Sequence, residues 1–262
     1  MVTNIIIRVD DICDGYDFTD MRKWFISNYP QIPVSFYITD SQYPYRWRTK
    51  NWKNIKDTIK DYNWEVGGHT RNHIHLPDLS TDKLESEIVN NIQDIQMGLK
   101  SVGLDYNITS FAYPFGEFDE RVKTVLRKTD IIHGLTYNSN ENYESLIAIP
   151  KENLYEIGIS CNTLKSIDDW NSRFEYVYEN GDTYILCLHT SHWIRGRNRE
   201  NIKRAIKSKS IKEIYFSIRR LSQYFFKKSS LDMWDLLNQH IKFILNHPNI
   251  RFITFKDLLT ID

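Results

Sequence analysis

Short apolar runs rich in β-branched and aromatic residues recur along the chain, and stretches with helical spacing separate them. The runs with strand character are residues 5–11, 34–39, 64–70, 108–116, 131–137, 154–160 and 183–189, with one more after Pro248. A helix is expected to begin at Ser80 or Thr81 and to end before Gly103, because apolar residues recur there every three or four positions. Two further helices are expected near 163–179 and before Pro248.

Alternation of strands and helices along the whole chain favours a parallel sheet. We therefore predict an α/β fold: one distorted (β/α) barrel, TIM-like with about seven strands, that spans residues 1–262 as a single domain. A basic helical insertion is expected near residues 195–230. In such barrels the reactive groups lie at the C-terminal ends of the strands.

Polar residues follow several of these strands at that end. Asp10 and Asp11 end the first strand, His69 ends the third, Pro114 to Gly116 end the fourth and His189 ends the seventh. The candidates for chemistry therefore fall on one rim of the predicted barrel.

The composition is that of an ordinary folded protein, with 41% hydrophobic and 26% charged residues in 262. Cys13, Cys161 and Cys187 are odd in number and widely separated, which argues against a disulfide framework and a cysteine zinc site. The chain shows no cationic leader followed by an apolar segment, and no apolar run of about 18 residues. A cytoplasmic location is expected.

The net charge of zero hides a basic segment, residues 195–228, which has 12 Lys/Arg against two Glu. One interpretation is a pair of amphipathic helices packed on the barrel with a solvated basic face. The other is an overhang that attracts a nucleotide-linked or lipid-linked phosphate, or makes peripheral contact with an anionic membrane. No nucleic-acid partner is predicted.

Three of the eight histidines lie within residues 69–75. On a helical turn, His69 and His73 would share one face, and an aspartate from another strand would complete a two-histidine, one-carboxylate metal site. Polar residues crowding a loop are the alternative, and His75 is expected to point elsewhere. Asp10 and Asp11 face opposite ways on a strand, so one could bind a metal while the other holds a proton; a solvated acidic turn is the alternative.

Five short motifs occur in a recognisable order. They are Arg8-Val9-Asp10-Asp11-Ile12, His69-Thr70-Arg71-Asn72-His73 with Leu76 beyond, Ala112-Tyr113-Pro114-Phe115-Gly116, Asp169-Trp170, and Leu186-Cys187-Leu188-His189. In this order they resemble the motifs of the polysaccharide deacetylases, carbohydrate esterase family 4, which include chitin and peptidoglycan deacetylases. The resemblance covers most of the chain.

The resemblance implies a role for each matched residue. Asp11, His69 and His73 would bind a divalent metal, with Zn²⁺ expected and Co²⁺, Ni²⁺ or Fe²⁺ as alternatives. Asp10 would be the general base and His189 the general acid. The backbone N–H of Phe115 would help to hold the oxyanion.

Two positions depart from the family pattern. Ala112 stands where the family has the arginine that pairs with the catalytic aspartate, and Ile12 stands where it usually has glycine. Arg8 lies two residues before Asp10 on the same strand, so both side chains share a face, and an arginine that faces into a barrel needs a carboxylate partner. We expect Arg8 to replace the missing arginine; an outward-facing surface residue is the alternative.

The leading hypothesis is a metal-dependent hydrolase that removes an N-acyl group, N-acetyl first, from an amino sugar. A carbohydrate-binding relative with weakened catalysis, a sugar O-acetyl esterase and an N-deformylase are the alternatives. The candidate substrate contacts are Tyr113, Pro114, Trp170 and His192, and Trp170 has an ordinary helix start as its alternative.

Overall fold

The computed structural model describes residues 2–39, 41, 47–137, 153–162, 166–180, 183–189 and 233–259. Both the basic segment 195–228 and His192 lie outside these residues. The predictions made for them stay predictions.

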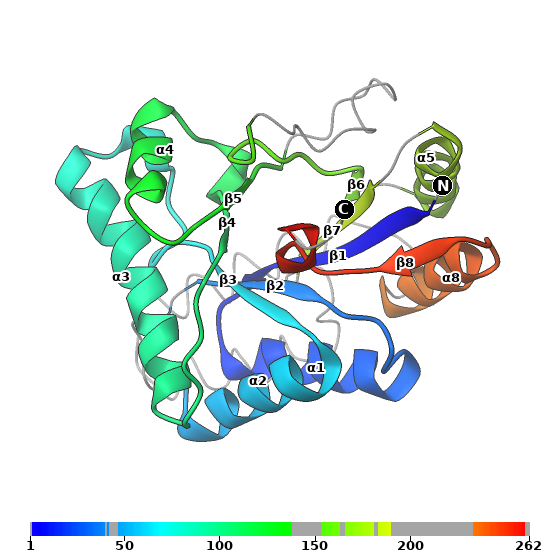
Figure 1. Ribbon diagram of the computed structural model, residues 1–262, viewed down its shortest axis with the longest axis horizontal. Coiled ribbons are helices and arrows are strands. Elements are labelled where there is room, and N and C mark those ends of the chain that lie inside the picture. The colour runs from blue at the N-terminus through cyan, green and yellow to red at the C-terminus, as the bar shows by residue number, and fades with distance from the viewer. Residues whose placement is uncertain are drawn as a thin grey trace, which may run out of the picture.

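Eight strands in the described residues form one sheet whose pairs are all parallel. They are β1 (Thr3–Ile12), β2 (Ser35–Ile38), β3 (Glu65–Gly68), β4 (Ser110–Ala112), β5 (His133–Leu135), β6 (Cys161–Asn162), β7 (Thr183–His189) and β8 (Ile250–Phe252). The strand order is β5-β4-β3-β2-β1-β7-β6, and β8 pairs with the first residues of β1. The long strand β1 is therefore the centre of the sheet (Figure 1).

The segment 154–162 links the two edges of this sheet. On one side, the N–H groups of Gly134 and Thr136 donate to the carbonyls of Leu154 and Ile157, at 2.8 and 2.9 Å. On the other, the N–H of Ser160 donates to the carbonyl of Ile185 on β7 at 2.9 Å. The expected strand at 154–160 is thus an irregular connection followed by the two-residue β6, and the predicted distorted barrel is confirmed.

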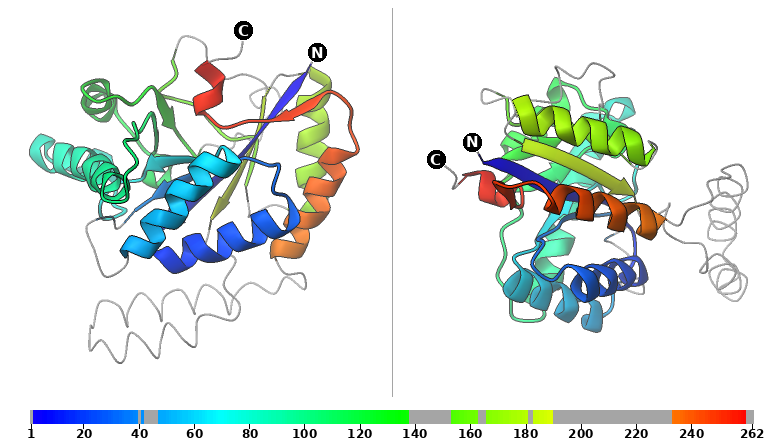
Figure 2. Two further views of the ribbon diagram at one scale, coloured as in Figure 1. Left: turned by 60° about the horizontal axis from the view of Figure 1, so that its bottom comes forward. Right: turned by 90° about the vertical axis from the view of Figure 1, so that its right-hand side faces the viewer.

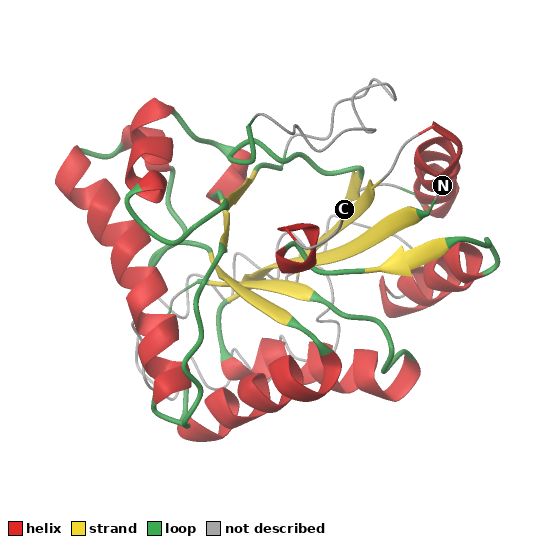
Figure 3. Cartoon of the chain, viewed as in Figure 1, coloured by secondary structure: helices red, strands yellow, loops and turns green. Residues whose placement is uncertain are grey.

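Helices cover the outside of the strands, as Figures 1 and 3 show. They are α1 (Gly15–Asn28), α2 (Thr49–Tyr62), α3 (Thr81–Lys100), α4 (Glu120–Arg127), α5 (Ile167–Asn180) and α8 (Met233–Leu245). The same layering is seen from two further directions in Figure 2, where α5 and α8 flank β1 and β7. Within the described part of the chain, no helix has both the length and the apolar character needed to span a bilayer.

Alternation along β1 separates two hydrophobic clusters. Ile5, Ile7 and Val9 belong to the cluster that packs under the helices. Ile6 belongs instead to a smaller cluster inside the barrel, together with Ala112, Cys187 and Phe255 among others. Because side chains alternate along a strand, Arg8 and Asp10 share the inner face with Ile6. This is how the sequence delivers two charged side chains to the interior of the barrel.

The N-terminal end of the barrel is closed by a buried carboxylate. Glu65 accepts hydrogen bonds from the hydroxyls of Ser35 and Ser110, at 2.8 and 2.6 Å, and from the N–H of Lys256 at 3.1 Å. Lys256 begins the short 3₁₀ helix η5 (Lys256–Leu259), which lies against the sheet (Figure 1). The candidate site lies at the opposite end of the barrel, where the strands have their C-termini.

Candidate metal centre and active site

Asp11, His69 and His73 lie together at the C-terminal end of the barrel. The Nε2 atoms of His69 and His73 are 3.3 and 3.0 Å from the same Oδ1 of Asp11. One ligand atom from each residue can be chosen so that all lie within 4.8 Å of one another. Burial acts to raise the pKa of Asp11, but the imidazoles of His69 and His73 beside it hold that pKa well below its usual value.

The hydrogen bond made by Nδ1 of His69 determines which way Nε2 points and whether it carries a proton. The Nδ1 atom lies 2.7 Å from the carbonyl oxygen of Ala112, so this nitrogen carries the proton and donates it. Nε2 is then free of a proton and available as a ligand. Ala112, which stands where the family has arginine, thus contributes to the centre through its backbone.

Two expectations about local geometry are corrected. His69 and His73 do not lie on a helical turn: residues 69–75 form a loop in which Thr70 and His73 are left-handed, with φ of 61° and 49°. Asp11 also has a positive φ of 61°, and the pairing of β1 with β2 shifts register between Val9 and Ile12. This irregularity turns Asp11 inward, which a regular strand would not allow directly after the inward Asp10.

Helix α3 holds the histidine loop in place through polar residues that the sequence analysis did not identify. The side chain of Asn91 accepts the N–H of His69 at 2.9 Å. Glu87 accepts the N–H of Asn72 at 2.9 Å, and Asp94 accepts two hydrogen bonds from Arg71 at 2.7 and 3.1 Å. The signal was present in the sequence: Glu87, Asn91 and Asp94 recur every three or four residues on a helix whose other inward positions are apolar.

Arg8 and Asp10 form a buried ion pair beside this centre, as expected. Arg8 donates from Nε and a terminal nitrogen to the two carboxylate oxygens of Asp10, at 2.9 and 2.7 Å, and donates once more to the carbonyl of Thr136 at 2.7 Å. The exposed fractions of Arg8 and Asp10 are 0% and 2%. Burial acts to raise the pKa of Asp10, but the charge of Arg8, followed by smaller contributions from His69 and His189, leaves that pKa below its usual value.

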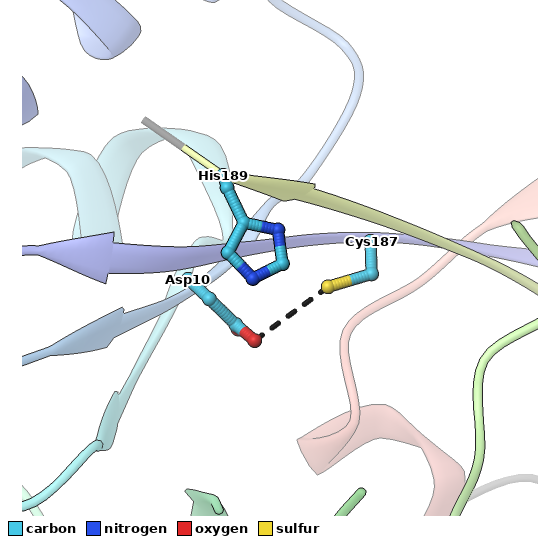
Figure 4. Close-up of side chains that lie close together, drawn as sticks. All are labelled: Asp10, Cys187 and His189. Atoms are coloured by element: carbon cyan, nitrogen blue, oxygen red, sulfur yellow. Dashed lines mark hydrogen bonds between the residues drawn. The ribbon is translucent and has the colours of Figure 1, made fainter. Parts of the chain in front are cut away.

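His189 ends β7 directly beside Asp10, to which it is matched in the register of the two strands. Burial lowers the pKa of His189, and the charges of Asp11 and Asp10 only partly oppose this. The ring of Tyr137, another residue missed in the sequence, lies perpendicular to the imidazole, with 4.9 Å between the ring centroids. Figure 4 shows Asp10 and His189 with Cys187, whose thiol donates to Asp10 at 3.5 Å.

His75 and Phe115 form the outer edge of the site. The two rings are stacked, 4.0 Å apart and 4° from parallel, and Nδ1 of His75 lies 2.7 Å from a carboxylate oxygen of Glu117. His75 therefore points away from Asp11, as expected. The ring of Phe115 also packs edge-on against His73, and 48% of Phe115 remains exposed.

The three candidate substrate contacts within the described residues, Tyr113, Pro114 and Trp170, are all buried. Tyr113 is 1% exposed, and its hydroxyl donates to the carbonyl of Tyr155; Pro114 is buried at the start of η2 (Pro114–Gly116). Trp170 is also 1% exposed, and its indole N–H donates to the carbonyl of Asn162. Trp170 lies in the first turn of α5, so the helix-start alternative describes its position, and its role as a substrate contact stays a prediction.

The donor set can be tested against a divalent ion from this geometry alone. Two imidazole nitrogens and one carboxylate oxygen already converge, and the hydrogen bond from Nδ1 of His69 leaves Nε2 as the nitrogen directed at the centre. Three ligands of this type leave coordination positions for water and substrate, as catalytic sites for Zn²⁺ or Fe²⁺ require. The residues fit a divalent transition metal.

Comparison with known proteins agrees with this geometry. Residues 21–133 match the family model described as polysaccharide deacetylase. No curated protein matches the chain.

Solved structures share the fold at low sequence identity. A family 4 acetyl xylan esterase from Clostridium thermocellum in complex with a cobalt ion is 13% identical, with a TM-score of 0.56 over 98% of this chain and 91% of that one. A 4-alpha-glucanotransferase from Thermococcus litoralis is 11% identical, with a TM-score of 0.58 over 99% of this chain and 40% of that one. The fold alone therefore does not determine the reaction.

A CE4 family pseudoenzyme from Bacillus anthracis is 14% identical with a TM-score of 0.46, and the match covers 79% of this chain and 60% of that one. This chain thus spans less than two thirds of that relative. The family match over residues 21–133 and the shared barrel agree with the resemblance drawn from the ordered motifs.

Proposed function

We propose that this chain is a metal-dependent hydrolase that removes an N-acyl group, with N-acetyl as the first candidate, from an amino sugar. One observation carries the proposal. Asp11, His69 and His73 converge next to a buried carboxylate, Asp10, and the imidazole of His189 lies beside that carboxylate.

In this proposal Asp11, His69 and His73 hold the ion, with Zn²⁺ expected and Co²⁺, Ni²⁺ or Fe²⁺ as alternatives. When bound, the ion would supply Lewis acidity, which lowers the pKa of water and polarises the acyl carbonyl. The remaining steps are assigned to residues of the chain itself.

Asp10 is the proposed general base. Its lowered pKa keeps the carboxylate ionised at neutral pH, and the two hydrogen bonds from Arg8 fix its plane. The Oδ1 oxygen, which accepts one hydrogen bond from Arg8, keeps a second lone pair with which to accept a proton from the attacking water. Arg8 is a positioning residue in this scheme, because it acts through Asp10.

His189 is the proposed general acid. Because burial lowers its pKa, its protonated form gives up a proton more readily than a free imidazolium does. An amide nitrogen must be protonated before it can leave, so such an acid suits an N-acyl substrate. The backbone N–H of Phe115, in the left-handed turn at the edge of the site, is the proposed additional donor to the oxyanion.

The test is a release assay with metal-loaded protein on matched sugars that carry N-acetyl, N-formyl or O-acetyl groups. We expect acetate from the N-acetyl sugar, and Asp10→Asn should lower that rate by at least about 100-fold while the bound metal is retained. Release from the O-acetyl or N-formyl sugar alone would change the bond assigned here. Sugar binding without release of any acid would identify a carbohydrate-binding relative.

We further propose a location and a wider substrate. A cytoplasmic enzyme of surface-polysaccharide or glycoconjugate synthesis would act on a nucleotide-linked or lipid-linked sugar. The positive charge of residues 195–228 supports an anionic substrate or contact with an anionic membrane.

A further inference from the structure

Cys187 occupies a position inside the barrel that the proposed reaction does not use. In the register of β1 and β7, Arg8 is matched to Cys187 and Asp10 to His189. Residues two apart on a strand share a face, so all four side chains point into the barrel in two adjacent rows. The thiol donates to Oδ2 of Asp10 at 3.5 Å, and the contact is visible in Figure 4.

A carboxylate oxygen, a thiol sulfur and an imidazole nitrogen are brought together in this way. One such atom each from Asp10, Cys187 and His189 can be chosen with all separations within 4.8 Å. In a tetrahedral zinc site with bonds of about 2.0–2.3 Å, ligand atoms lie roughly 3.3–3.7 Å apart. Side-chain movements of about 1 Å would therefore close the three donors around one ion.

We propose that Asp10, Cys187 and His189 form a second metal site, selective for thiophilic divalent ions such as Zn²⁺ and Cd²⁺ and distinct from the centre formed by Asp11, His69 and His73. Sulfur is the donor that gives this selectivity, because thiolates prefer zinc-like ions over Mg²⁺ or Ca²⁺, which take oxygen ligands.

The thiol proton decides the order in which the two sites fill, because an ion at Cys187 must displace it and an ion at Asp11 displaces none. With neutral histidines, Arg8, Asp10 and Asp11 together carry a formal charge of −1, and a divalent ion at Asp11 changes this to +1. A second ion must displace the thiol proton into solvent, and it adds a further net +1 beside the guanidinium of Arg8. The second ion therefore binds more weakly than the first.

Occupation of the second site has a consequence that rests on the proposed function. The ion would take the free lone pair of the carboxylate proposed as base and the ring nitrogen of the imidazole proposed as acid. Hydrolysis would stop even though the first centre is loaded. The second site would thus act as an inhibitory site for excess zinc.

The decisive experiment is a titration of the metal-free protein with Cd²⁺, followed by the ultraviolet charge-transfer absorption that cadmium gains on binding a thiolate. We expect two equivalents to bind, with the absorption appearing only during the second. Cys187→Ala should bind one equivalent and give no absorption. Cys13→Ala is the matched control, since Cys13 is also buried and also lies next to carboxylates, Asp14 and Asp17, yet it should leave the titration unchanged.

Other outcomes would overturn the inference. They are an absence of thiolate absorption in the parent, absorption during the first equivalent, and absorption that Cys13→Ala removes but Cys187→Ala retains. If Cys187→Ala does not fold, as judged by circular dichroism, the nearly isosteric Cys187→Ser takes its place with the same expectation.

An activity measurement separates this inference from the proposed function. At saturating first metal, the concentration of Zn²⁺ that halves acyl release should rise at least about 10-fold in the Cys187 variant, because loss of a ligand should cost at least as much affinity as loss of an outer-shell partner. A parent that binds two Cd²⁺ through Cys187 but hydrolyses no acyl sugar would refute the proposed function and leave the second site standing.

Discussion

Replacement of Arg8 by methionine should destabilise the protein strongly, because it leaves a carboxylate charge inside the barrel without its partner. Arg8 and Asp10 are 0% and 2% exposed, so water cannot solvate Asp10 once the guanidinium is gone. Breaking a buried ion pair by removing one partner costs about 3–5 kcal/mol. We expect Arg8→Met to lower the free energy of unfolding by that amount at neutral pH.

Asp10→Asn should also lower the free energy of unfolding, because it leaves the buried cation of Arg8 without a carboxylate partner. The double variant, Arg8→Met with Asp10→Asn, removes both charges and leaves a neutral pair. Its loss should be about 1–3 kcal/mol, the cost of poorly satisfied polar groups, and therefore smaller than that of either single variant. The coupling between the two positions is then several kcal/mol and favourable.

Urea unfolding of all four proteins, followed by tryptophan fluorescence in a metal chelator, measures these free energies; the chain has seven tryptophans to report the transition. The chelator removes any contribution of a bound ion. A double variant whose loss equals the sum of the two single losses would refute the reasoning, because it would mean that the two charges do not stabilise each other. Arg8 would then be stabilising the barrel through its hydrogen bond to Thr136 instead.

Three further predictions concern other parts of the molecule. Burial lowers the pKa of His240 to about 3, so between pH 6.5 and 3 the unfolded chain binds a proton that the folded chain does not. When the pH falls from 6.5 to 5, the free energy of unfolding measured in urea should therefore drop by ~2 kcal/mol more in the parent than in His240→Gln. Asn91→Ala should weaken Zn²⁺ binding about 10–100-fold in calorimetry because the N–H of His69 loses its side-chain acceptor and keeps only the carbonyl of Ile38, whereas Asn90→Ala on the outer face of α3 should not. His73→Ala should abolish metal binding measured by elemental analysis, and His75→Ala should keep it; the reverse result would mean that the wrong histidine was assigned to the centre.

The sequence was enough to predict the barrel and the pairing of Arg8 with Asp10, because both follow from periodicity. Alternating apolar runs define the strands, and a period of two places Arg8 on the same face as Asp10. The same rule, applied to Asp11, predicts the wrong side. The left-handed φ and the shifted register that turn Asp11 inward depend on the neighbouring strand β2, which local pattern does not reveal.

The burial of Trp170 and Tyr113 could not be predicted from the sequence, because it depends on contacts with other segments of the chain. Nothing near Trp170 in the sequence indicates that its indole faces Asn162 and the ring of His240 on α8 rather than a ligand. The side chain of Tyr113 is likewise buried among core residues, and its hydroxyl donates to the carbonyl of Tyr155. In both cases a motif residue that resembles a substrate contact is held in the core by hydrogen bonds to residues 8 and 42 positions away.

Backbone strain in the described residues is concentrated where the chemistry is proposed. Six residues other than glycine have positive φ, and two of them, Asn63 and Asn249, are asparagines, a residue type that tolerates this conformation. The other four, Asp11, Thr70, His73 and Phe115, all lie in the candidate site.

Each residue held in such a conformation costs of order 1–3 kcal/mol, and the cost is high for the β-branched Thr70. A relaxed loop would be more stable but would carry the two imidazoles away from Asp11. The hydrogen bonds from α3 and the bond from the N–H of His73 to the hydroxyl of Thr70 hold the strained form in place without an ion. The site is thus preorganised by its surroundings. This is why Asn91, a buried residue of α3 that does not bind the ion, should affect metal affinity.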